Sequence, residues 1–242
     1  KTALETLGYW RLAQIPNVEG ALVSLAVHDG AIEALVGGFD FKKSKFNRVM
    51  QAMRQPGSNF KPFIYSAALE HGFSASKFVN DAPIVFEAPG LESAWRPENF
   101  SGKYYGPTPL RKALAHSRNL VSIRLLRAIG VQNALDHVER FGFDVSRLPK
   151  NLSLSLGSGE VTPLELVSGY AILANGGFQI EPYFIERIES GDGDIVMQAD
   201  PASVCLDCVA VEIDEEDNEP LDIASLIQEA ERESERAATR TV

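Results

Sequence analysis

The sequence lacks the features that mark membrane-spanning, disulfide-stapled and unfolded proteins. Its 242 residues include only 2 Cys, and the 45% hydrophobic and 23% charged residues are an ordinary soluble composition. No window approaches the roughly 18 consecutive apolar residues of a membrane span, and residues 1–5 lack the basic segment and apolar run of an export signal. We therefore expect neither a membrane-spanning segment nor a targeting signal in this chain. We expect a core large enough to fold without disulfide bonds.

An excess of positive charge is also missing, and the negative charge is concentrated at one end. Residues 205–242 hold 12 of the 33 acidic and 3 of the 23 basic residues, a net charge of −9, which leaves residues 1–204 at −1. This tail has no aromatic residue, so we interpret it as a mobile acidic insertion or linker with one short helix near 221–237. A nearly neutral body without a basic stripe argues against nucleic acid as a partner.

Two β-rich runs near the start predict the first strands of an antiparallel sheet. They cover residues 21–27 and 31–36, and Asp29-Gly30 between them has the residue types of a tight hairpin turn. Before them, residues 1–17 contain an apolar set that is compatible with a leading helix.

Further along, the pattern becomes helical. The apolar stripe of this helix ends at Gly72, a natural stop, and Pro62 places the helix start close to Ser58 because proline is tolerated only in a first turn. The stripe consists of Phe60, Phe63, Ile64, Ala67, Ala68 and His71. Ser58, Lys61 and Tyr65 fall on another face, where the first two are within side-chain reach of each other.

A serine and a lysine at this spacing are a candidate nucleophile and base. A serine hydroxyl needs a neighbouring base to take its proton, and a lysine serves only if burial or nearby positive charge makes its neutral amine available. The free N–H groups of a helix start favour the developing oxyanion. The spacing alone is weak evidence, because 19 Ser and 9 Lys give about 0.7 such pairs by chance. We interpret the second pair, Ser74 and Lys77, as a solvated surface pair.

The surroundings of Ser58 carry more information than the spacing. Residues 46–65, which include Gln55-Pro-Gly-Ser58, strongly resemble the active-serine segment of class A penicillin-binding proteins, the bifunctional cell-wall synthases of bacteria. Residues 20–40, 107–119 and 156–177 resemble the same family in the same order. The likeness therefore covers about residues 18–190.

The resemblance implies both a fold and a site. The fold is α+β, the penicillin-recognising serine transpeptidase fold, with an antiparallel sheet and a large helical region. Ser58 is the implied nucleophile and Lys61 its base. The family's second motif, Ser-x-Asn, falls at Ser117 and Asn119, where Ser117 would relay a proton to the leaving group and Asn119 would contact Lys61 and a substrate amide. An N-cap serine beside a surface asparagine is the alternative interpretation.

Nearby segments complete this interpretation. Residues 120–129 read as a helix that ends at Gly130. The loop of residues 156–159 lacks the ending of a phosphate-binding loop, so by resemblance it borders the cleft, and residues 162–165 open the next helix. The four histidines, including His116 beside the second motif, are interpreted as packed or exposed rather than catalytic.

One element of the family is absent. The third motif, Lys-Thr/Ser-Gly, occurs nowhere in the sequence, and neither does the glycosyltransferase domain of relatives. In relatives the motif lies on a later strand that binds the substrate carboxylate and supplies part of the oxyanion hole. We therefore expect residues 18–204 to be the N-terminal part of a transpeptidase domain. A complementary C-terminal polypeptide carrying Lys-Thr/Ser-Gly is the expected partner, without which this chain is nearly inactive.

The implied reaction is D,D-transpeptidation of peptidoglycan stem peptides that end in D-Ala-D-Ala. Ser58 would attack the penultimate D-alanine carbonyl, release D-alanine and pass the acyl group to an amine of a neighbouring strand. β-Lactams mimic the donor and trap the serine. The resemblance implies no metal and no organic cofactor. It places a membrane-anchored full-length protein on the periplasmic face of the inner membrane of a Gram-negative bacterium.

Two alternative functions stay open at this point. A D,D-carboxypeptidase or β-lactamase-like hydrolase shares Ser-x-x-Lys but sends the acyl group to water. A non-catalytic penicillin-sensing or scaffold module would be labelled without turnover.

The pair Cys205 and Cys208 is read separately. It offers only two of the four ligands of a structural zinc. A local disulfide or two unpaired thiols are the remaining interpretations.

Overall fold

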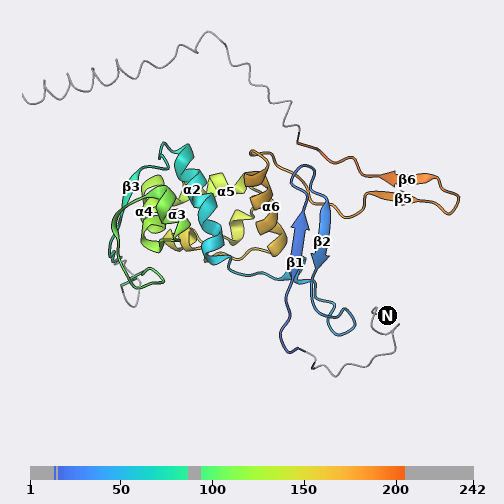
Figure 1. Ribbon diagram of the computed structural model, residues 1–242, viewed down its shortest axis with the longest axis horizontal. Helices are drawn as coiled ribbons and strands as arrows, with labels where there is room; N and C mark the ends of the chain where they lie inside the picture. Colours follow the sequence, from blue (N-terminus) through green and yellow to red (C-terminus); the bar gives the residue numbers. More distant parts are fainter. Residues whose placement is uncertain (1–13, 15, 87–93, 205–242) are drawn as a thin grey trace, which may run out of the picture. The chain divides into compact units, whose positions relative to one another are not determined.

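The computed structural model describes residues 14, 16–86 and 94–204, all of which fall in one compact unit spanning Lys1–Val204 (Figure 1). Within these ranges no helix is long and apolar enough to cross a membrane. The acidic tail, its predicted helix and its two cysteines lie outside the described residues, as does most of the predicted leading helix. The domain limits at residues 17 and 204 stay predictions.

The predicted hairpin at the start of the domain is confirmed. Strands β1 (Leu22–Leu25) and β2 (Ile32–Val36) pair antiparallel, with an irregularity after Ser24. Gly30 in the turn has a φ of +84°, and a Cβ there would lie 2.4 Å from the carbonyl oxygen of Glu181. Only glycine permits this conformation and this close approach, so the turn is pinned against a segment about 150 residues later in the chain.

Two further strand pairs are also antiparallel. Strand β3 (Phe78–Asp81) pairs with β4 (Gly106–Pro109), and β5 (Arg187–Glu189) pairs with β6 (Ile195–Gln198). In the part of the chain that the structure describes, each of the three sheets has two strands. Figure 1 shows the β5–β6 hairpin extending away from the helices, and every residue of its strands is exposed.

The predicted helix after Ser58 is confirmed with one difference. A single 3-10 turn, η2 (Gly57–Phe60), leads into α2 (Lys61–Glu70), with Pro62 in the first turn. The apolar stripe is fully buried except for its last member, His71, which is exposed because the chain leaves the helix there and turns at Gly72 (φ +82°).

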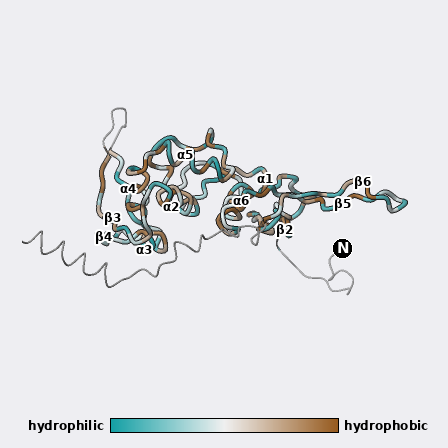
Figure 2. Tube along the Cα trace, turned by 90° about the horizontal axis from the view of Figure 1, so that it is seen from above, coloured by the Kyte–Doolittle hydropathy of each residue, from teal (hydrophilic) through white to brown (hydrophobic). Residues whose placement is uncertain are grey.

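The core is built around α2. Phe63 contacts four other aromatic rings at centroid distances of 4.9–5.5 Å, and α2 packs against the two helices that follow the second motif. Figure 2 shows hydrophobic residues recurring along the helices of this body. The remaining helices and 3-10 turns are α1 (Arg48–Gln51), α3 (Leu110–Ala115), α4 (Asn119–Ile129), α5 (Val131–Glu139), η3 (Val145–Arg147), η4 (Leu152–Leu156) and α6 (Pro163–Ala174).

One of these helices ends, and another begins, where the sequence predicts. Helix α4 ends at Gly130, whose φ is +89°. Helix α6 begins with a capping box, in which Thr162 and Glu165 each bond the other's backbone N–H. The α+β fold class is confirmed, with the helices forming the core and the strands paired in short antiparallel sheets.

Candidate active site

Ser58 lies in the turn η2, immediately before α2. Its carbonyl oxygen accepts a hydrogen bond from the backbone N–H of Lys61, and its side chain is exposed. The neighbouring Phe60 is completely buried. The candidate nucleophile is therefore presented to solvent from a turn that is anchored in the core.

A close backbone contact holds this turn from the other side. Gly57 (φ +58°) donates its N–H to the carbonyl oxygen of Gly157 over 3.1 Å. Gly157 itself has a φ of +67°, and a Cβ on it would lie 2.1 Å from the Gly57 oxygen. Gly157 therefore requires glycine, whereas at Gly57 the left-handed φ favours it. The loop of residues 156–159, expected to border the cleft, thus contacts the turn that carries Ser58.

Lys61 is 1% exposed, and its ammonium group meets three oxygen atoms of the second motif. Nζ lies 2.8 Å from the Ser117 carbonyl oxygen, 2.9 Å from Ser117 Oγ and 2.7 Å from Asn119 Oδ1. Burial lowers the pKa of Lys61 to about 8. About one tenth of the molecules then carry a neutral amine at pH 7, which is the form that a general base needs.

Ser117 has an unusual backbone conformation. Its φ of +53° makes it the only non-glycine residue with a positive φ in the described ranges. Ser117 N–H bonds the carbonyl of Leu114 and Arg118 N–H bonds that of Ala113, each at 2.9 Å, the pattern of a Schellman motif that ends α3. Glycine usually occupies this position, because a left-handed conformation costs an L-residue about 1–2 kcal/mol. The strained turn brings the Ser117 hydroxyl to Lys61.

Asn119 is the first residue of α4, and both ends of its side-chain amide are held. Oδ1 accepts from Lys61, while Nδ2 donates to the carbonyl of Glu98 over 2.8 Å. The N-cap of α4 is Arg118, so the alternative interpretation of Ser117 as an N-cap serine is wrong.

Of the four predicted site residues, the structure joins three at one atom, Lys61 Nζ, and places the fourth, Ser58, one turn earlier. Within the described ranges no hydrogen bond links the Ser58 hydroxyl to Lys61. Tyr65, which shares the helical face of the pair, is buried beside α4, and burial raises its pKa to about 12.

The other candidates lie elsewhere. Ser74 and Lys77 are exposed, which confirms their interpretation as a surface pair. His116 is exposed with Nδ1 2.9 Å from the Lys112 carbonyl, and His137 of α5 is buried against Ser66 of α2. The described part of the chain has no group of three His, Cys, Asp or Glu side chains arranged to hold a metal ion.

The three oxygen atoms around Lys61 differ in what they can do. The Ser117 carbonyl and Asn119 Oδ1 only accept hydrogen bonds, whereas the Ser117 hydroxyl both accepts and donates. A neutral Lys61 amine therefore donates to the two fixed acceptors and offers its lone pair to a serine hydroxyl. This arrangement is suited to taking a proton from one hydroxyl and passing it through another.

Sequence reasoning missed the segment of Glu98 and Asn99, which holds Asn119 in place. The segment belongs to a loop about 20 residues earlier, where periodicity carries no information. Its local sequence, Pro97-Glu98-Asn99, lies outside the four stretches that carry the resemblance.

The fold and the site define a penicillin-recognising serine transpeptidase domain. Residues 20–225 match the family model described as the penicillin-binding protein transpeptidase domain, and the chain belongs to this family. It is 53% identical over 197 residues to penicillin-binding protein 1A of Pseudomonas aeruginosa, a match covering 81% of this chain and 24% of that protein. It is 46% identical over 199 residues to the Escherichia coli K12 protein of the same name, covering 82% and 23%.

Solved structures agree with these sequence matches. Penicillin-binding protein 1A from Haemophilus influenzae is 42% identical with a TM-score of 0.80, covering 86% of this chain and 31% of that one. PonA1 from Mycobacterium tuberculosis, in complex with penicillin V, is 26% identical with a TM-score of 0.65, covering 75% and 51%. The chain spans about a quarter of the length of the curated relatives.

Proposed function

We propose that this chain is the serine-bearing part of a D,D-transpeptidase that cross-links peptidoglycan stem peptides ending in D-Ala-D-Ala. One observation supports this above the others. The buried Lys61 amine, with a pKa of about 8, follows Ser58 by one turn and touches both Ser117 and Asn119. Substrate, location on the periplasmic face of the inner membrane and membrane anchoring of the full-length protein belong to the same proposal.

The acylation step uses these residues in order. Ser58 Oγ attacks the carbonyl carbon of the penultimate D-alanine while its proton passes to Lys61 Nζ. The ammonium returns a proton through Ser117 Oγ, 2.9 Å away, to the nitrogen of the departing D-alanine. The C–N bond breaks and a Ser58 ester forms. The second proton on Asn119 Nδ2, beyond the one donated to Glu98, is available to a substrate carbonyl.

The acyl group then leaves Ser58 for an acceptor amine. The amine nitrogen attacks the ester carbonyl, loses a proton to Lys61 and displaces Ser58 Oγ, which recovers its proton. A β-lactam in place of the peptide acylates Ser58 in the same way. Transfer to water instead of an amine would define the hydrolase alternative, and product analysis with and without an amine acceptor separates the two.

The oxyanion hole and carboxylate site require a polypeptide carrying Lys-Thr/Ser-Gly. The β1–β2 sheet has two strands in the described structure. A bridge between Ala31 and Tyr183 occupies the start of the β2 edge, so within the described ranges the β1 edge is the one open to a further strand. The apolar side chains of Leu22 and Val36 on it are 56% and 52% exposed. A strand that pairs with this sheet would complete the domain.

The base assignment is tested with a matched pair of variants in the full-length protein. Lys61→Arg keeps the positive charge, but arginine stays protonated, so labelling of Ser58 by a fluorescent penicillin is expected to be lost. Lys77→Arg makes the same change at the same spacing from an exposed serine and is expected to leave labelling unchanged. Substantial labelling of Lys61→Arg would contradict the assignment.

A further inference from the structure

The start of helix α4 is capped from outside the helix. Its N-cap residue, Arg118, makes no side-chain hydrogen bond to the helix, which leaves the first N–H groups without a local acceptor. Asn99 supplies one from 20 residues earlier. Its Oδ1 accepts from Asn119 N–H over 2.9 Å, and Leu120 N–H points at the same oxygen from 3.5 Å. Asn99, although distant in sequence, thus caps the helix as the side chain of an N-cap residue usually does.

The orientation of the Asn99 amide is fixed by its other end. Nδ2 lies 2.8 Å and 3.0 Å from the two carboxyl oxygens of Asp81, and 2.9 Å from the Lys103 carbonyl. All three are acceptors, so the nitrogen must face them and the oxygen must face α4. Asp81 is 0% exposed at the end of β3, and Asn99 is 4% exposed. Burial keeps bulk solvent from replacing these contacts.

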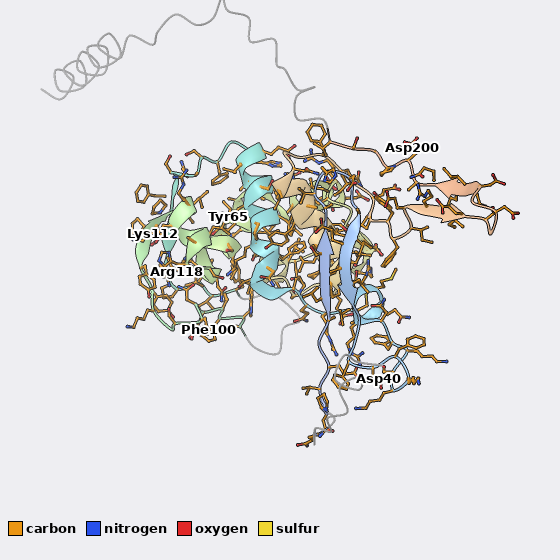
Figure 3. The ribbon with its side chains drawn as sticks, turned by 45° about the vertical axis from the view of Figure 1, so that its right-hand side comes forward. Asp40, Tyr65, Phe100, Lys112, Arg118 and Asp200 are labelled. Carbon is orange, nitrogen blue, oxygen red and sulfur yellow. The ribbon has the colours of Figure 1, made fainter. Side chains whose placement is uncertain are left out.

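The same loop also sets the side chain of Asn119. Asn119 Nδ2 donates to the carbonyl of Glu98, so its Oδ1 is turned to Lys61 Nζ. Backbone and side chain of Asn119 are therefore held by two consecutive residues. Figure 3 labels Phe100 and Arg118, the chain neighbours of Asn99 and Asn119, and both lie at the same end of the molecule.

We infer that Asn99, oriented by Asp81, is a positioning residue for the second motif and, through Asn119, for the Lys61 amine. This inference rests on the proposed function. Asn99 touches no reacting atom. It fixes where α4 begins, and this sets where Asn119 Oδ1 and the Ser117 oxygens meet Nζ. A displacement of about 1 Å at such a centre typically costs about 100-fold in rate.

The test uses the full-length protein and a penicillin whose binding and acylation steps are measured separately. Asn99→Ala is expected to slow acylation about 10- to 100-fold and to leave the dissociation constant of the non-covalent complex within about twofold. Hydrogen exchange of the Asn119 N–H is expected to accelerate, since its acceptor is removed.

Asn175→Ala is the matched control. Asn175 is also a buried asparagine, 5% exposed, whose amide bonds the backbone at Val27, Gly177 and Phe178. Its loss is expected to lower the melting temperature about as much as Asn99→Ala, but to leave acylation and Asn119 exchange unchanged. Equal slowing of acylation in the two variants would show a merely structural role and overturn the inference.

A charge exchange keeps the inference testable if Asn99→Ala fails to fold. Asn99→Asp alone sets a second buried carboxyl group against that of Asp81 and is expected to lose acylation. Adding Asp81→Asn restores one amide and one carboxyl group in exchanged places, with a carboxylate at a helix start, and is expected to recover at least tenfold. No recovery would overturn the inference. Unlabelled wild-type protein would instead overturn the proposed function, and Asn119 exchange would still decide whether Asn99 holds the helix start.

Discussion

A lysine that serves as a base destabilises the fold that holds it. The folded pKa of Lys61, about 8, lies below the 10.5 of an exposed lysine. Between these pH values the unfolded chain binds more protons than the folded one, so the stability of the fold rises with pH in that window. Below pH 8 the full cost of burying the ammonium is present. The same burial supplies the neutral amine, so the cost in stability and the chemistry have one cause.

The pH dependence of acylation follows from this pKa. In the proposed mechanism only the neutral amine accepts the Ser58 proton, so the acylation rate constant is expected to rise about tenfold per pH unit below pH 8 and to level off above it. Stopped-flow acylation of the full-length protein between pH 5.5 and about 9.5 measures the curve. A flat profile from pH 6 to 8 would mean that another group takes the proton.

Ser117 combines strain and chemistry in one residue. Ser117→Gly relieves the left-handed conformation and removes the hydroxyl beside Lys61. We expect the free energy of unfolding to rise by up to about 1 kcal/mol while acylation slows at least about 100-fold. Ser117→Ala removes the hydroxyl but keeps the strain, so it should be the less stable of the two. Denaturant unfolding compares them, and the reverse order of stability would contradict the strain.

At the scale of elements, the sequence predicted those helices whose pattern or ends depend on residues close together in the chain. The apolar stripe of α2, the Gly130 stop and the capping box of Thr162 and Glu165 each depend on residues within a few positions of each other. They predicted three helices and the setting of Ser58 and Lys61. Contacts between distant segments left no such signal.

Three features of the site were therefore not predictable from the sequence. Gly57 meets Gly157 across 100 residues, and Asn99 caps a helix that begins 20 residues later. The left-handed Ser117 occupies the position where glycine usually ends a helix. Without that glycine, no signal in the sequence marks the end of α3. The resemblance to a family identified Ser117 and Asn119, but only the packing of α2 against α4 explains why they meet Lys61.

The approach of the two glycines is a testable element of the site. Gly157→Ala would set a Cβ 2.1 Å from the Gly57 oxygen and is expected to displace the Ser58 turn, with a loss of about 100-fold in acylation. Gly72→Ala is the control, because its φ of +82° carries similar backbone strain but a Cβ there meets nothing within 4 Å. Both variants should be destabilised, and only the first should acylate slowly. Equal acylation would show that the contact does not hold Ser58.

At the scale of the whole molecule, the described half of the site is assembled on the helical core. Lys61 and Asn119 sit on helices that pack directly against each other, and Ser117 lies in the turn before α4, so their contacts need no further strand. The hydrogen-bond donors for a developing oxyanion, by contrast, do not all belong to this helical part. We expect the free N–H groups of the turn η2, which precedes α2, to supply some of them, and the resemblance assigns the others to the Lys-Thr/Ser-Gly strand.

This division predicts how the isolated chain behaves. Residues 1–242 alone keep Lys61 with Ser117 and Asn119, but loss of even one oxyanion-hole donor typically costs about 100- to 1000-fold in rate. We therefore expect Ser58 in the isolated chain to be labelled at least 100-fold more slowly than in the full-length protein. Adding a polypeptide that carries Lys-Thr/Ser-Gly should restore labelling, and near-UV circular dichroism should report whether the aromatic side chains around Phe63 are fixed in the core. Efficient labelling of Ser58 in the isolated chain, with a cooperative unfolding transition, would show that the helical half forms a complete site.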